Sequence, residues 1–370
     1  MTVDARTGPE VEQVGSPRAA VLAMPSYKPG KDAKQSEAEL GITNAIKLAS
    51  NENPLPPLPE VVAAITAVIG GVNRYADHRA MDLRAVLAQW QGVELSHVTV
   101  GNGSSAILHR LAAAYVDAGD EVLYPWRSFE VYPVYTKLLD GIPVTVPLVD
   151  ETADLAGLAA AITERTKLIM IANPNNPTGT ALSATKLNEF CSQVPRNVVV
   201  VIDEAYFEFV DPALGNTIVD VLPHHPNVIV TRTFSKAQGL AGLRVGYAVA
   251  DPQIISAIDK TQLPFAVNAA AQAGAIAAVQ HSDKIAMRVR DIVEERGRVL
   301  AEVRSWGVEV PESQANFVYL PLGAKANAVF AAMERDGVVI RLFDQLGVRI
   351  TISTPAENTR MLLSLKNALA

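Results

Sequence analysis

The sequence predicts an α/β fold with a mostly parallel sheet covered by helices on both faces, followed by a smaller α+β unit. Three observations support this fold class. Apolar runs of strand length recur from residue 97 to residue 249, amphipathic helical patterns separate them, and polar turns follow several of them. Alternating strands and helices are typical of parallel sheets, whose strands are apolar throughout because helices cover both faces.

The expected elements follow in chain order. The strands of the large sheet are expected at 97–101, 121–124, 143–147, 167–172, 198–202, 228–232 and 244–249. After the first strand, Ser104 is expected to cap a helix with an apolar stripe. Beyond residue 260 the pattern changes to long helices, clearest over 283–305. The remainder predicts three strands and two helices, near 315–320, 338–343, 347–352, 325–336 and 356–368.

These patterns divide the chain into four parts. Residues 1–16 are polar and contain Gly and Pro, so we expect a flexible tail. Residues 17–45 are expected to pack on the smaller unit. The large ligand-binding domain is expected over 46–262, and the small C-terminal domain over 263–370.

Composition favours a protein that acts on small molecules. The 370 residues are 49% apolar, and 32 basic and 39 acidic side chains are intermixed with a net charge of -7. This pattern indicates neither a nucleic-acid partner nor a membrane surface. Without an apolar span or a signal-peptide core, we expect a cytoplasmic location. The single cysteine, Cys191, excludes a disulfide within the chain and a cysteine-rich metal site, and no metal is expected.

Polar segments follow four of the expected strands, at the edge where parallel sheets bind ligands. The segment Gly101-Asn102-Gly103-Ser104-Ser105 either caps a helix or offers backbone amides to a phosphate. The segment 173–179 is either an ordinary Asn/Pro/Gly turn or a site where Asn176 donates to an oxygen of an aromatic cofactor.

The third segment begins with Asp203, directly after an apolar strand. A carboxylate there is costly unless it is paired, so Asp203 is a helix cap, half of a structural ion pair, or the partner of a protonated ring nitrogen. Tyr206 would then reach the same ring from the side opposite Asn176.

The fourth segment, Thr233-Phe234-Ser235-Lys236-Ala237, contains a lysine at a strand end with Arg244 beyond it. A lysine is most often exposed. A buried one near positive charge can form a Schiff base, and Thr233, Ser235 and Arg244 could bind an anion beside it. Together the four segments supply the groups that pyridoxal phosphate requires.

The chain resembles the fold-type I, pyridoxal-phosphate-dependent aminotransferases in four ordered motifs: Asn176-Pro177-Thr178-Gly179, Asp203-Glu204-Ala205-Tyr206, Ser235-Lys236 and Arg244-Val245-Gly246. It is similar to the histidinol-phosphate aminotransferase branch, which includes bacterial aromatic amino acid (phenylalanine) aminotransferases, in three others: Ser50-Asn51-Glu52-Asn53-Pro54, Arg74-Tyr75-Ala76-Asp77 and the stretch 236–244. The resemblance extends from about residue 20 to the C-terminus.

The resemblance implies roles for the matching residues. Lys236 would hold the cofactor as a Schiff base and shuttle the substrate proton, Asp203 would pair with the ring nitrogen, and Phe129 or Trp126 would stack on the ring. The remaining cofactor contacts would come from Asn176, Tyr206, Ser104, Ser105, Thr233, Ser235, Arg244 and, from a neighbouring subunit, Tyr75. The family therefore implies a homodimer with shared active sites.

The resemblance also implies substrate contacts. Arg349 would bind the substrate carboxylate, Asn51 lies in a family motif at the site, and Tyr27 and Arg341 would face the distal end. Arg341 favours a phosphate, whereas the neighbouring Leu342 and Phe343 indicate an apolar wall. Histidinol-phosphate enzymes commonly have an acidic pair after the glycine of the phosphate-binding loop, whereas this chain has Ser104 and Ser105 after Gly103.

We therefore expect transamination of an aromatic amino acid with 2-oxoglutarate by a ping-pong mechanism. A histidinol-phosphate aminotransferase is the alternative, and a decarboxylase or lyase is more distant because Arg349 would retain the substrate carboxylate. A regulatory cofactor-binding domain is disfavoured because no basic helix-turn-helix pattern is present.

Overall fold

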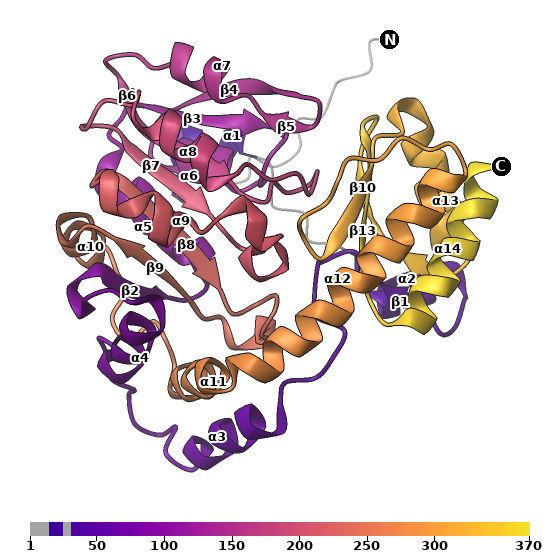
Figure 1. Ribbon diagram of the computed structural model, residues 1–370, viewed down its shortest axis with the longest axis horizontal. Helices are drawn as coiled ribbons and strands as arrows, with labels where there is room; N and C mark the ends of the chain where they lie inside the picture. Colours follow the sequence, from indigo (N-terminus) through magenta and orange to yellow (C-terminus); the bar gives the residue numbers. More distant parts are fainter. Residues whose placement is uncertain (1–14, 25–30) are drawn as a thin grey trace, which may run out of the picture.

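A large twisted sheet forms the centre of the first unit (Figure 1). The computed structural model describes residues 15–24 and 31–370, and within them this sheet has eight strands in the order β2-β9-β8-β7-β6-β3-β4-β5. Their bounds are β2 Val98–Gly101, β3 Glu121–Trp126, β4 Ile142–Val149, β5 Thr152–Ala153, β6 Thr166–Ala172, β7 Val199–Asp203, β8 Val228–Thr233 and β9 Gly246–Ala250.

The neighbouring strands β4, β3, β6, β7 and β8 are mutually parallel, which confirms the expected mostly parallel sheet. The run expected at 244–249 forms β9, which is antiparallel to both β8 and β2. The short strand β5 is antiparallel to β4.

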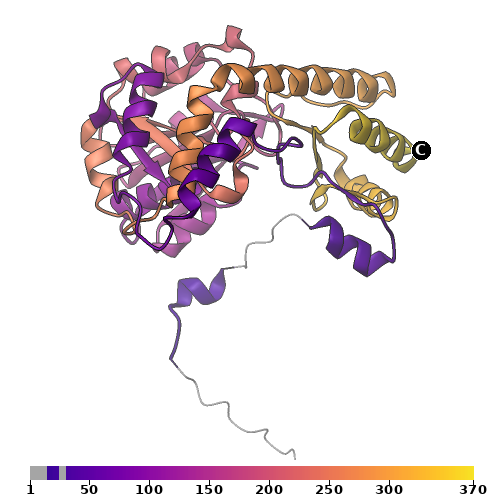
Figure 2. The ribbon, with the colours of Figure 1, turned by 90° about the horizontal axis from the view of Figure 1, so that it is seen from below.

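Helices cover both faces of this sheet (Figures 1 and 2). Alternate residues of β7 point to opposite faces, so Val200 and Ile202 belong to one apolar cluster while Val199 and Val201 belong to the other. The helices are α3 Pro59–Ile69, α4 Met81–Gln91, α5 Ser104–Tyr115, α6 Tyr132–Leu138, α7 Leu155–Ala160, α8 Ala184–Cys191, α9 Thr217–Asp220, α10 Pro252–Asp259 and α11 Ala269–Gln280. Both faces of the central strands β6, β7 and β8 are therefore buried, which explains why these strands are mostly apolar, whereas β4 near the edge is partly exposed.

The second unit packs helices against a small antiparallel sheet of order β10-β13-β12, and the long helix α12 connects it to the first unit (Figure 1). Its bounds are α12 Ser282–Ser305, β10 Phe317–Leu320, α13 Ala326–Arg335, β12 Arg341–Phe343, β13 Gly347–Thr351 and α14 Pro355–Leu369. The strand expected at 338–343 is divided, because Val338–Val339 forms β11 and pairs in parallel with β1, Ile46–Lys47.

The N-terminal segment contacts both units. Helix α2, Ala33–Leu40, lies beside the second unit (Figure 2), where Ser36 Oγ donates a hydrogen bond of 2.9 Å to Glu334. Ahead of helix α1, Ala19–Ala23, Arg18 pairs instead with Asp140 of the first unit at 2.9 Å. Of the expected segment 17–45, the described residues 31–45 therefore include contacts with the small unit, whereas Arg18 contacts the first unit.

Two further details differ from expectation. Helix α11 packs against α3 and α4 of the first unit, although the expected boundary after residue 262 assigned it to the second. Ser104 is the first helical residue of α5 and Gly103 takes the cap position. No helix among the described residues combines the length and apolar character of a membrane span.

Candidate active site

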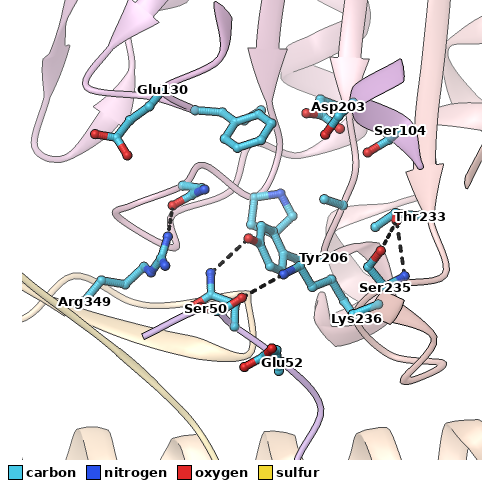
Figure 3. Close-up of a pocket in the computed structure, with 18 of the residues that line it drawn as sticks. Ser50, Glu52, Ser104, Glu130, Asp203, Tyr206, Thr233, Ser235, Lys236 and Arg349 are labelled. Atoms are coloured by element: carbon cyan, nitrogen blue, oxygen red, sulfur yellow. Dashed lines mark hydrogen bonds between the residues drawn. The ribbon is translucent and has the colours of Figure 1, made fainter. Parts of the chain in front are cut away.

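A cavity of about 260 Å³ lies at the carboxyl ends of β6, β7 and β8, between the two units (Figure 3). Thirteen of the expected site residues line it: Asn51, Ser104, Ser105, Phe129, Asn176, Asp203, Tyr206, Thr233, Ser235, Lys236, Arg244, Arg341 and Arg349. Figure 3 shows Ser104, Thr233 and Ser235 at one end and Arg349 and Glu130 at the other, with Lys236 and Tyr206 between them.

Lys236 follows β8 and points into this cavity. Its Nζ donates a hydrogen bond of 3.1 Å to the backbone carbonyl of Ser50. Burial, with the nearby positive charges of Arg349 and Arg244 adding to it, lowers the pKa of Lys236 to about 7. A large fraction of this amine is therefore neutral at physiological pH, as a nucleophile toward an aldehyde must be.

Asp203 ends β7 and is 3% exposed. It accepts hydrogen bonds from Thr231 Oγ1 at 2.9 Å and from the Tyr132 hydroxyl at 3.1 Å, and burial raises its pKa to about 6. Both donors are neutral, and no ion pair between described residues involves Asp203. A buried carboxylate without a cation is costly, so a protonated ring nitrogen in the cavity would supply the missing charge.

The adjacent Glu204 has a different role. Its carboxylate is buried against Arg232 at 2.7 Å, within the first unit, and it does not line the cavity. Of the two successive carboxylates, only Asp203 is available to a ligand.

The start of helix α5 and the β8–β9 loop form an anion cradle. Arg244 donates to Ser235 Oγ at 3.2 Å, and Thr233 Oγ1 donates to the same hydroxyl at 3.0 Å. A Cβ on Gly103 would lie 2.5 Å from the Arg244 guanidinium, so only glycine lets these groups approach. Hydroxyls, a guanidinium and helix-terminal amides fit the phosphate of the cofactor.

Three further amide and hydroxyl groups line the cavity, from Asn51, Asn176 and Tyr206. The Tyr206 hydroxyl accepts a hydrogen bond of 2.9 Å from Asn51 Nδ2. The Asn176 Oδ1 accepts from Arg349 Nη1, which leaves the Asn176 amide nitrogen to donate to a ligand oxygen. Asn176 and Tyr206 both line the cavity, as the resemblance implies for two residues that contact the cofactor ring.

Arg349 lies on β13, the central strand of the small sheet, and is 7% exposed. Its Nη2 donates to the backbone carbonyl of Ala49 at 2.7 Å. A buried guanidinium held by a carbonyl and by an amide oxygen is preorganised to bind a carboxylate.

The remaining expected contacts lie differently. Phe129 lines the cavity, whereas Trp126 packs with Tyr124 at a ring-centroid distance of 5.9 Å and is not part of the lining. Tyr75 is outside the cavity and 82% exposed, with its ring stacked on Phe265 at 4.3 Å. Tyr27 lies outside the described residues.

Three residues that contact the site's charged groups were not predicted from the sequence: Thr231, Tyr132 and Glu130. Thr231 is the register partner of Asp203 in the sheet, and its hydroxyl in an otherwise apolar strand was the available signal. Tyr132 and Glu130 come from the stretch after β3, and nothing in the local pattern indicates which groups they contact.

Comparisons with known proteins agree with this geometry. A sequence model of the family described as aminotransferase class I and II matches residues 43–365. An aromatic amino acid aminotransferase of Rhodococcus jostii (strain RHA1) is 47% identical over 346 residues, 93% of this chain and 94% of that protein. One from Corynebacterium jeikeium (strain K411) is 45% identical over 358 residues, covering 95% and 94%.

The fold is shared with solved structures. The histidinol-phosphate aminotransferase from Sinorhizobium meliloti in complex with pyridoxal-5'-phosphate superposes with a TM-score of 0.88 at 29% identity, over 95% of this chain and 96% of that one. An aspartate aminotransferase mutant from Thermus thermophilus has a TM-score of 0.81 at 23% identity, over 96% and 100%, and shows the fold alone.

Proposed function

The chain belongs to the class I and II aminotransferases, and we propose that it transfers the amino group of an aromatic amino acid (phenylalanine, tyrosine or tryptophan) to 2-oxoglutarate. The observation that carries this proposal is the buried Lys236 amine, with its pKa lowered to about 7, in one cavity with Asp203 and Arg349. The aromatic amino acid aminotransferases that are 47% and 45% identical to the chain support the substrate class.

Pyridoxal phosphate is the cofactor, and when bound it supplies an electron sink for the bond cleaved at the substrate's α-carbon. Lys236 would hold its aldehyde and Asp203 its ring nitrogen. The phosphate would bind to the cradle described above, and Phe129 rather than Trp126 would cover the ring because only Phe129 lines the cavity.

The chain's own groups account for the remaining chemistry. Arg349 orients the substrate carboxylate, which fixes the α-carbon relative to Lys236. Lys236 Nζ has a pKa of about 7, so a large fraction of it is neutral near physiological pH and would be able to take the proton from the α-carbon. Asp203, with a pKa of about 6, is mostly ionised near neutral pH and would keep the ring nitrogen protonated. The same groups acting in reverse on 2-oxoglutarate give a ping-pong sequence.

One observation favours each of two substrates. Arg341 lines the distal part of the cavity and would attract the phosphate of histidinol phosphate. That guanidinium already pairs with Glu130 at 2.7 Å, and Phe343 lines the same wall, whereas Leu342 packs on the main apolar core. A compensated charge beside an aromatic ring favours an aromatic side chain. A decarboxylase is disfavoured because Arg349 would hold the carboxylate in place.

The discriminating experiment compares kcat/KM for phenylalanine, tyrosine and histidinol phosphate, each with 2-oxoglutarate as acceptor. We expect parallel double-reciprocal plots and a preference for the two aromatic donors. A strong preference for histidinol phosphate would reverse the substrate assignment, and release of CO₂ would replace transamination altogether.

We also propose a homodimer in which Tyr75 of each chain completes the phosphate site of its partner. Tyr75 is exposed at 82% and lies outside its own chain's cavity, as a residue donated to another subunit would. Its ring is held by stacking on Phe265.

A further inference from the structure

Arg341 and Arg349 occupy directly opposite positions on β12 and β13. Directly opposite residues of an antiparallel pair project from the same face, with Cβ atoms about 5 Å apart. Both arginines line the cavity. Two like charges at such positions repel each other, so one of them requires a counter-charge whenever the ligand brings a single carboxylate.

Glu130 provides this counter-charge. Its Oε2 lies 2.7 Å from Arg341 Nη2, and it also lines the cavity. The two residues are 211 positions apart and belong to different units. The loop that carries Glu130 is fixed at its start, because Ser128 Oγ donates to Asn175 at 2.8 Å and the Asn175 amide donates to the Arg127 carbonyl at 3.1 Å.

We propose that Glu130 determines how one cavity accepts both substrates, an inference that rests on the proposed function. While an aromatic side chain is bound, Glu130 stays paired with Arg341. When 2-oxoglutarate binds, its distal carboxylate takes the place of Glu130 on the Arg341 guanidinium. Arg349 binds the other carboxylate in both cases.

The exchange of one carboxylate for another on Arg341 should cost little free energy in either direction. One carboxylate replaces another on the same guanidinium, so the charge of the site does not change. The Glu130 side chain is 35% exposed and can return to water at low cost, whereas the Arg341 side chain is 16% exposed and loses more if it is left without an anion. The ring centroid of Phe343 lies 5.9 Å from Cζ of Arg341 and 5.9 Å from Cζ of Arg349. This ring gives an aromatic substrate an apolar wall.

The test uses two inert ligands of the holoenzyme, glutarate and 3-phenylpropanoate, which differ in the distal group. Their dissociation constants are measured by calorimetry for the wild type, E130Q, R341Q and the double variant. We expect E130Q to bind glutarate roughly three- to fivefold more tightly, because no internal carboxylate competes, and to bind 3-phenylpropanoate more weakly. R341Q should bind glutarate more weakly than the wild type does. Adding E130Q to R341Q should not change either dissociation constant further.

The control is Glu164→Gln, which removes an exposed carboxylate that does not line the cavity. It should leave both affinities unchanged. An E130Q protein whose ratio of glutarate to 3-phenylpropanoate affinity equals that of the wild type would overturn the inference, as would full additivity of the E130Q and R341Q effects.

The same proteins separate this inference from the proposed function. If the wild type does not transaminate phenylalanine but E130Q shifts the affinity ratio, the substrate assignment fails, and only the competition of Glu130 with a ligand carboxylate for Arg341 stands. If phenylalanine is a good donor and the ratio does not move, the role of Glu130 fails alone.

Discussion

Nζ of Lys236, just after strand β8 of the large sheet, donates a hydrogen bond to the backbone carbonyl of Ser50, in the segment between β1 and α3. A neutral acceptor holds the amine in the cavity without restoring its charge. The lysine therefore retains the low pKa that burial imposes on it.

Replacing Lys236 with alanine should abolish turnover. Proton transfer by a positioned side chain contributes roughly 10²–10⁴-fold, and the covalent hold on the cofactor is lost as well. The variant should still fold, because a smaller apolar residue replaces an amine that is costly to bury. Borohydride treatment followed by peptide mass analysis should label position 236 in the wild type only, and turnover by the variant at the parent rate would refute the assignment.

The stability of the cofactor-free protein should rise with pH above neutrality. Lys236 has a pKa of about 7 in the folded chain and 10.5 as its ordinary value, so between these values the unfolded chain binds more protons. The free energy of unfolding therefore increases from about pH 7 to about pH 10 on account of this group. Lys236→Met should flatten the rise in urea unfolding measured at successive pH values.

The matched control for this pH experiment is Lys186→Met, which removes an exposed lysine at the surface of α8. Its unfolding curves should follow the wild-type pH dependence. Equal slopes for the wild type and Lys236→Met would show that the buried amine is not the source.

Asp203→Asn should separate activity from stability. The variant cannot keep the ring nitrogen protonated, so kcat should fall by roughly 10²–10³. Burial raises the pKa of Asp203 to about 6 from an ordinary 3.8, so this carboxylate makes the folded cofactor-free chain less stable as pH rises from about 4 to 6. Above pH 6 the variant should therefore unfold at the same or a higher urea concentration than the wild type.

Glu204→Gln provides the contrasting case. It breaks the ion pair with Arg232, in which both side chains are buried, so stability should fall by about 3 kcal/mol or more. Loss of stability in Asp203→Asn as large as in Glu204→Gln would mean that Asp203 is structural.

These two carboxylates show what the sequence could and could not predict. The apolar run before them predicts a buried strand, and the resemblance assigns Asp203 a role. Both predictions use only residues that are close to Asp203 in the sequence. Sheet register and the neighbouring strand decide which carboxylate meets Arg232 and which meets Thr231. The same limit applies to Glu130, whose partner Arg341 is 211 positions away, because only the tertiary fold brings them together.

The helices that connect the two units show a similar limit. Helical spacing predicted α12 almost to its ends, 283–305 against Ser282–Ser305. The pattern could not show that α11 packs on α3, because an alanine-rich helix has no distinct apolar face and its neighbours determine where it lies.

Gly103→Ala should weaken cofactor binding. Gly103 has φ +78°, and an added Cβ would lie 2.5 Å from Arg244 Nη2. The Arg244 guanidinium would have to leave the anion cradle, so the dissociation constant for pyridoxal phosphate should rise about tenfold, or ~1.4 kcal/mol. Gly297→Ala in α12 is the control, since nothing lies within 4 Å of the added atom, and it should leave cofactor affinity unchanged. Equal affinity in both variants would contradict the proposed cradle.

Mixing two defective variants tests whether the active sites are shared. In a dimer of one Lys236→Ala chain and one Tyr75→Phe chain, one site has both defects and the other has neither, provided that Tyr75 acts across the interface. Activity should therefore reappear after the two inactive or weakened proteins are unfolded, mixed and refolded, and light scattering should report a dimer. Tyr75 is 82% exposed, so Tyr75→Phe should not lower the stability of the single chain. If Tyr75 served its own chain's site instead, each subunit of the mixed dimer would carry one defect and the mixture would show only the average of the two parent activities.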